Sequence, residues 1–112
     1  MQETKIGNVT VVKAPGRLDT VTAPEFEKQL MALVNGGSIR VVVDATAMDY
    51  VSSAGLRTFL SIAKRLQQAK GKLTLGGLTH QVKEIFDIAG FSGILPIFAT
   101  SDEAVKACQP TA

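Results

Sequence analysis

Hydrophobic and polar positions along the chain follow two different periods, which separate strands from helices. Residues 41–43 form a continuous run of valines, which predicts a strand covered on both faces. After Asp44 and a short polar passage, apolar residues recur every three or four positions and predict a helix that begins near Ser52-Ser53. The residues expected to face the core from this helix are Leu56, Phe59, Leu60, Ala63 and Leu66.

The same patterns divide the rest of the chain. Gly7-Asn8 joins two short apolar stretches and predicts a tight hairpin. Thr22 and Glu25 have the spacing of a capping box, and Gly71 stands where a glycine commonly ends a helix. The predicted strands are residues 3–6, 9–14, 39–44, 73–75 and 94–98, and the predicted helices begin at Thr22, Ser53, Thr79 and Ser101.

Strands that alternate with helices predict an α/β fold with right-handed crossovers. We expect a single domain over residues 1–112, with an ordered core at about 3–108. Its sheet is mostly parallel, with about five strands, an N-terminal antiparallel hairpin and four helices. Partners of such sheets meet the loops beyond the carboxyl ends of the strands. Asp19, Asp44 and Ser52-Ser53 all follow strands at that end, so we expect them to converge.

Composition removes several classes of function. The net charge is only +2 and the basic residues are scattered, which disfavours nucleic acid as a partner. The apolar stretches are far shorter than the ~20 residues that span a bilayer, so we expect no direct membrane insertion. The first residues lack a basic segment followed by an apolar one, and Cys108 stands alone. We therefore expect no secretory signal and no internal disulfide, and a cytoplasmic location.

Two hydroxyl groups stand where a buried strand leads into a helix. Serine is a preferred N-cap residue, so Ser52 or Ser53 is expected to cap the helix. A helix N-terminus also favours a negative group, so a phosphate on either serine has a favourable site. The two roles are compatible, because one hydroxyl can cap while its neighbour faces solvent. Asp19 also has two interpretations. It follows a strand at the end of the sheet where partners bind, but an aspartate in a loop also often forms hydrogen bonds with its own backbone.

Catalytic and metal chemistry is poorly supported. A receiver-type phosphoacceptor at Asp44 needs an acidic pair to hold Mg²⁺, and Asp19 stands alone. Zinc needs more than one His and one Cys. A serine hydrolase would use His80 as its base, but no G-x-S-x-G segment is present. We expect no metal and no cofactor, a structural role for Asp44 in the turn after its strand, and a solvated His80.

Three short motifs carry a resemblance to a known family. They are G-x-L-D ending at Asp19, V-V-V-D ending at Asp44, and S-S-A-G-L over residues 52–56. In order and spacing, and with the strands and helices that follow, the chain from about residue 4 to 107 resembles a STAS domain. Within that family it resembles the stand-alone anti-sigma factor antagonists.

The resemblance implies a regulator that exchanges partners. In the family, the serine two residues before the glycine is phosphorylated by a serine/threonine kinase that is also the anti-sigma factor; aligned on Gly55, that residue is Ser53. The unmodified form binds the kinase, the phosphorylated form does not, and a serine phosphatase restores it. The implied partner surface comprises Asp19, Ser52, Ser53, Ala54, Gly55 and Arg57.

The chain departs from the family pattern at three positions. Ser52 replaces a common Asp, Ala54 replaces the usual Ser or Thr, and Arg57 stands where a second glycine is common. Ser52 is therefore a second candidate for modification. Two other functions stay open, a STAS subunit of a lipid-transport or other membrane-associated complex and, as a weaker alternative, a small serine hydrolase. Monomer and weak dimer also stay open.

Overall fold

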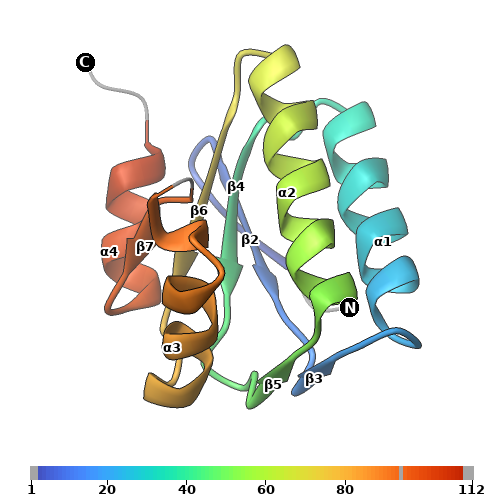
Figure 1. Cartoon of the computed structure of the whole chain (residues 1–112). Helices are drawn as coiled ribbons and strands as arrows, with labels where there is room; N and C mark the ends of the chain where they lie inside the picture. The colour runs from blue at the N-terminus through green and yellow to red at the C-terminus, as the bar shows by residue number, and fades with distance from the viewer. Residues whose placement is uncertain (1–2, 94, 110–112) are drawn as a thin grey trace.

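A five-stranded sheet runs through the computed structural model, which describes residues 3–93 and 95–109 (Figure 1). Its strands are β1 (Glu3–Ile6), β2 (Val9–Lys13), β4 (Arg40–Asp44), β6 (Lys72–Gly76) and β7 (Ile97–Phe98). They lie in the order β1-β2-β4-β6-β7, with β1 antiparallel to β2 and the other pairs parallel. The predicted α/β fold with an N-terminal hairpin is confirmed.

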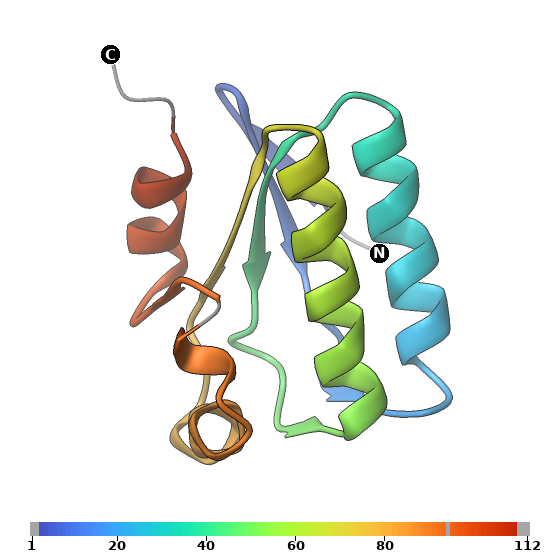
Figure 2. The same cartoon turned by 45° about the horizontal axis from the view of Figure 1, so that its top comes forward.

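Helices cover the two faces of this sheet unequally. The helices are α1 (Ala23–Asn35), α2 (Ser53–Gln68), α3 (His80–Ile88) and α4 (Ser101–Cys108), and a 3₁₀ turn covers Phe91–Gly93. The side chains of α1, α2 and α3 share the main core, whereas α4 packs on the opposite face against β4 and β6 (Figure 2). Of the first two strands, β2 contributes buried residues to both cores, whereas all four residues of β1 are exposed.

The central strand is buried because helices cover both of its faces. Val41, Val42 and Val43 are all 0% exposed. The first and third valine face the main core, while Val42 joins the smaller core beneath α4. In the main core three phenyl rings follow one another, with centroids 6.2 Å apart between Phe26 and Phe59 and 5.7 Å apart between Phe59 and Phe86. The continuous apolar run thus predicted this strand correctly.

The side of α2 that faces the core differs from the prediction. Leu56, Phe59 and Leu66 are buried as expected, but Thr58 and Ile62 are buried in place of Leu60 and Ala63, which are half-buried. The apolar residues of α2 form two neighbouring stripes, so their spacing is compatible with more than one orientation. Packing against α1, the sheet and α3 decides which stripe turns inward.

The end of α2 also differs from the prediction. Gly71 was expected to end the helix, yet the left-handed position is taken by Lys70, with φ of 60°. The N–H of Gly71 then donates to the carbonyl of Leu66 at 2.7 Å, which closes the helix end. Gly71 is needed for another reason, because a Cβ atom there would overlap the carbonyl oxygen of Ile39.

The remaining helices and strands were placed nearly correctly. Thr79 caps α3 through the N–H of Val82, as expected. Thr100, one residue before the predicted start, caps α4 through the N–H of Glu103. The last strand is shorter than predicted, and Ile94 lies outside the described residues. Cys108, the last residue of α4, is buried, and burial raises the pKa of its thiol. No helix in residues 3–93 and 95–109 is long and apolar enough to cross a membrane.

Candidate functional site

A second, very small sheet brings the two candidate segments together. The strands β3 (Arg17–Leu18) and β5 (Tyr50–Val51) pair in parallel, with Leu18 opposite Val51. The N–H of Ser52 continues this ladder by donating to the carbonyl of Leu18 at 2.9 Å. The Asp19 loop therefore lies beside the first turn of α2 (Figure 1). Neither strand is predicted by the sequence pattern, because two residues are too few to show a period.

The two serines at the start of α2 take different positions. Ser52 is the N-cap, in an extended conformation, and its Oγ accepts from the N–H of Gly55 at 3.4 Å. Ser53 is the first helical residue and is exposed. The first turn of α2, all of which the structure describes, contains no acidic residue. The prediction that one serine caps while its neighbour faces solvent is confirmed, and the exposed residue lies at the positive end of the helix dipole.

Asp19 fixes the neighbouring loop with its side chain. Its Oδ1 accepts from the N–H of Val21 at 2.9 Å and from the N–H of Thr22 at 3.1 Å. The hydroxyl of Thr22 in turn accepts from the N–H of Asp19 at 2.9 Å and donates to the carbonyl of Arg17 at 2.8 Å. The predicted capping box of Thr22 and Glu25 is therefore wrong. Thr22 makes no side-chain cap, since its hydroxyl is engaged in the loop.

Arg17 joins the same cluster, although no motif or period predicts its place there. Its Nε donates to Oδ2 of Asp19 at 2.9 Å, and its guanidinium lies 4.3 Å from the centre of the Tyr50 ring. These contacts arise because β3 and β5 place Arg17 directly opposite Tyr50. Arg17, Asp19 and Tyr50 are therefore joined by non-covalent contacts and lie next to the N-terminal end of α2, where Ser53 is exposed.

The electrostatics of Asp19 follow from these bonds. The N–H of Thr22, the Arg17 guanidinium and the N–H of Val21 hold the pKa of the Asp19 carboxyl below its ordinary value of 3.8. Each of these donors favours the ionised form of Asp19. The loop geometry therefore stabilises the negative charge, and the negative charge stabilises the loop.

We expect an Asp19→Asn variant to be less stable than wild type by an amount that depends on pH. Because the folded-state pKa of Asp19 is lowered, its ionisation stabilises the fold above the unfolded value of about 3.9, and this stabilisation disappears as pH falls through the folded value. The melting temperature of wild type should exceed that of the variant near neutral pH, and the difference should shrink below about pH 4. Thermal melts from pH 2 to 7 measure it. A difference independent of pH would contradict this account.

The other predicted partner-surface residues lie along the first turns of α2. Ala54 is half-buried and Arg57 is exposed. Gly55 is buried, and a Cβ atom added to it would lie 2.8 Å from Cγ2 of Val51 and 2.9 Å from the Leu18 carbonyl oxygen. Glycine at this position therefore lets α2 begin directly against the small sheet, and Gly55 can serve a partner surface only by positioning its neighbours.

Asp44 does not join this cluster. Its Oδ1 accepts from the N–H of Thr46 at 3.1 Å and from the Thr46 hydroxyl at 2.7 Å, as expected for a structural role. Its carboxylate lines a cavity of about 310 Å³ beside α4, together with Lys13. Burial raises the pKa of Asp44, but the Thr46 hydrogen bonds and the charge of Lys13 outweigh it, so the pKa lies below 3.8.

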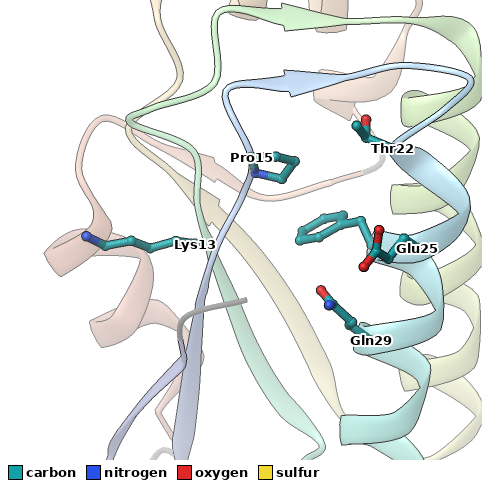
Figure 3. A pocket seen from close by; sticks show the side chains of 6 residues that line it. Lys13, Pro15, Thr22, Glu25 and Gln29 are labelled. Carbon is teal, nitrogen blue, oxygen red and sulfur yellow. The ribbon is translucent and has the colours of Figure 1, made fainter.

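Catalysis would need a cavity with paired reactive groups, and metal binding would need grouped ligand side chains. A cavity of about 260 Å³ lies between β2 and α1, where Glu25 and Gln29 project from the helix near Phe26 while Lys13 points away (Figure 3). It contains no paired nucleophile and base. The side chain of His80 is 88% exposed and lies 3.8 Å from Glu84. In the described parts of the chain, no three His, Cys, Asp or Glu side chains are grouped to hold a metal ion.

The sequence of this chain is similar to one domain family and to regulatory proteins of one class. A sequence model of the STAS domain matches residues 1–104. BtrV of Bordetella bronchiseptica, provisionally named an anti-sigma factor antagonist, is 42% identical over 108 residues, covering 96% of this chain and 92% of that protein. The anti-sigma-B factor antagonist of Listeria monocytogenes is 33% identical over 82 residues, covering 73% of this chain and 72% of that protein.

Solved structures show the same fold. An anti-sigma factor antagonist from Mycobacterium paratuberculosis superposes with a TM-score of 0.87 at 24% identity, covering 97% of this chain and 92% of the other. The Bacillus cell fate determinant SpoIIAA in its phosphorylated form superposes with a TM-score of 0.73 at 17% identity, covering 96% of this chain and 98% of the other.

Proposed function

Since the chain belongs to the STAS domain family, we propose that it is a non-enzymatic regulator, an anti-sigma factor antagonist controlled by phosphorylation of Ser53. The observation that carries the proposal is the exposed Ser53 at the first position of α2, beside an N-cap serine and the fixed Asp19 loop. The names of the two curated relatives support the same class.

The proposed cycle has two partners. The unmodified domain binds an anti-sigma factor serine/threonine kinase in the cytoplasm through the surface around Asp19, Ser53 and Arg57. The kinase transfers the γ-phosphoryl group of ATP to the Ser53 oxygen, and ADP leaves. A serine phosphatase then hydrolyses the phosphoserine and restores binding. The occupied kinase releases its other target, the sigma factor.

Electrostatics explain why phosphate would act as a switch here. A phosphoserine carries about −1.5 to −2 charges at neutral pH. On the free domain the N-terminus of α2 can accommodate this charge without rearrangement. In a packed interface the same group would have to lose its water, and an unmatched charged contact costs about 2–5 kcal/mol. The phosphate therefore blocks binding without refolding the domain.

Intact-mass measurement tests the position of the modification. After incubation with ATP and its anti-sigma factor serine kinase, wild type should gain one phosphoryl group. Ser53→Ala should gain none, whereas Ser52→Ala should still be modified, although loss of its cap destabilises the helix by about 1 kcal/mol. Uptake of phosphate by Ser53→Ala at the wild-type rate would place the modification elsewhere.

A further inference from the structure

One edge of the central sheet is free to pair. β1 is the outermost strand, and none of the described residues pairs with its outer side. All four of its residues are exposed, including Ile6 at 43%. An uncovered edge presents a row of backbone N–H and C=O groups that can extend the sheet with another strand.

The opposite edge is much less suitable. β7 contains only two residues and follows directly after Pro96, which has no N–H to donate. Short strands and proline are common ways in which proteins block an edge. Of the two edges, β1 is therefore the one that can accept a strand.

The side chains of β1 are complementary to a second copy of the same strand. Glu3 and Lys5 point to one face, because they pair with Val12 and Thr10 of β2, and Thr4 points to the other. In an antiparallel pair with Thr4 opposite Thr4 of the second copy, each Glu3 lies opposite a Lys5. Opposite charges and threonine pairs stabilise neighbouring strands.

Alternative registers are disfavoured by the same charges. Centring the pair on Glu3 would place two carboxylates opposite each other, and centring it on Lys5 would place two ammonium groups opposite each other. Like charges directly opposite are destabilising. The alternation of sign around Thr4 therefore favours this register over those centred on Glu3 and on Lys5.

We propose that two copies of this chain associate through β1, antiparallel and centred on Thr4, to form one continuous sheet. The contact is isologous, as expected for a two-fold dimer. In this register residues 3–5 of each copy pair, and edges this short bury far less than the ~1,200–2,000 Å² of a stable interface, so the dimer is weak and depends on concentration. It uses none of the residues assigned to the partner surface around Ser53, and it does not depend on the proposed phosphorylation.

Charge reversal tests the pairing. Sedimentation equilibrium from about 10 μM to 1 mM should show dimerisation of wild type, a range suited to a weak contact. Glu3→Lys or Lys5→Glu should weaken it about tenfold, because each places like charges opposite one another twice. The double variant Glu3→Lys/Lys5→Glu should restore it, and Lys64→Glu on α2 serves as the matched charge control. A monomer throughout, or a double variant weaker than either single one, would overturn the proposal.

Cross-linking tests the register. Residues opposite each other on antiparallel strands have Cα atoms about 4.5–5.5 Å apart, within the range of a disulfide. Thr4→Cys should therefore form a disulfide-linked dimer under mild oxidation, while Lys5→Cys alone should not. Cys108 does not compete because it is buried. Equal cross-linking of the two variants would exclude the register centred on Thr4.

Discussion

A Ser53→Asp variant is expected to bind the anti-sigma factor kinase about 30- to 4000-fold more weakly than wild type, from an interface cost of about 2–5 kcal/mol. The carboxylate imitates part of the phosphate charge at the exposed first position of α2. In the free domain the same charge faces the positive end of the helix, which stabilises it by about 0.3–1 kcal/mol. The melting temperature should therefore stay the same or rise slightly while the affinity falls.

Titration calorimetry and a thermal melt of the same samples separate these two effects. Ser38→Asp is a matched control, since it adds the same charge in the connection before β4, at the opposite end of that strand from the Ser53 surface. We expect this control to bind the kinase with wild-type affinity. Equal affinity of Ser53→Asp and wild type would remove the switch, and a large fall in its melting temperature would show that the variant acts by unfolding.

A Gly71→Ala variant is expected to lower the free energy of unfolding by about 3 kcal/mol, at the upper end of the usual cost of overpacking. The added methyl group would overlap the carbonyl oxygen of Ile39. That oxygen cannot move away freely, because it accepts from the N–H of Lys72 at 2.8 Å where β6 begins beside β4. Relief of the clash would therefore disturb the pairing of two central strands.

Urea denaturation followed by circular dichroism measures this loss. Gly93→Ala provides the control, since Gly93 is exposed and an added Cβ atom there would meet no described atom within 4 Å apart from its chain neighbours. The control should change the unfolding free energy by no more than about 0.5 kcal/mol. If both variants were equally stable, the turn after α2 would have to relax more easily than its hydrogen bonds indicate.

Local signals in the sequence were sufficient wherever one segment determines its own structure. The three central valines identified the buried strand, because a strand between two helix layers needs apolar side chains on both faces. The pair Ser52-Ser53 located the start of α2, since an N-cap depends on neighbouring residues only. The order of these segments was also enough to indicate the fold and the STAS family.

Other features depend on contacts between segments that are distant in the sequence. Thr22 does not form the predicted capping box with Glu25, because its hydroxyl is held by the loop that β3 positions. Arg17 meets Tyr50 only because two strands of two residues lie side by side. No period or motif could predict such a pairing.

The sequence by itself therefore determined the order of strands and helices, the buried central strand and the serine at the start of α2. The tertiary structure alone decided which side of α2 faces the core, why Gly71 has no side chain, and which groups surround Ser53. The physical reason is the range of the interactions. Periodicity and capping act within a few residues, whereas close packing and hydrogen bonds across loops exist only once the chain has folded.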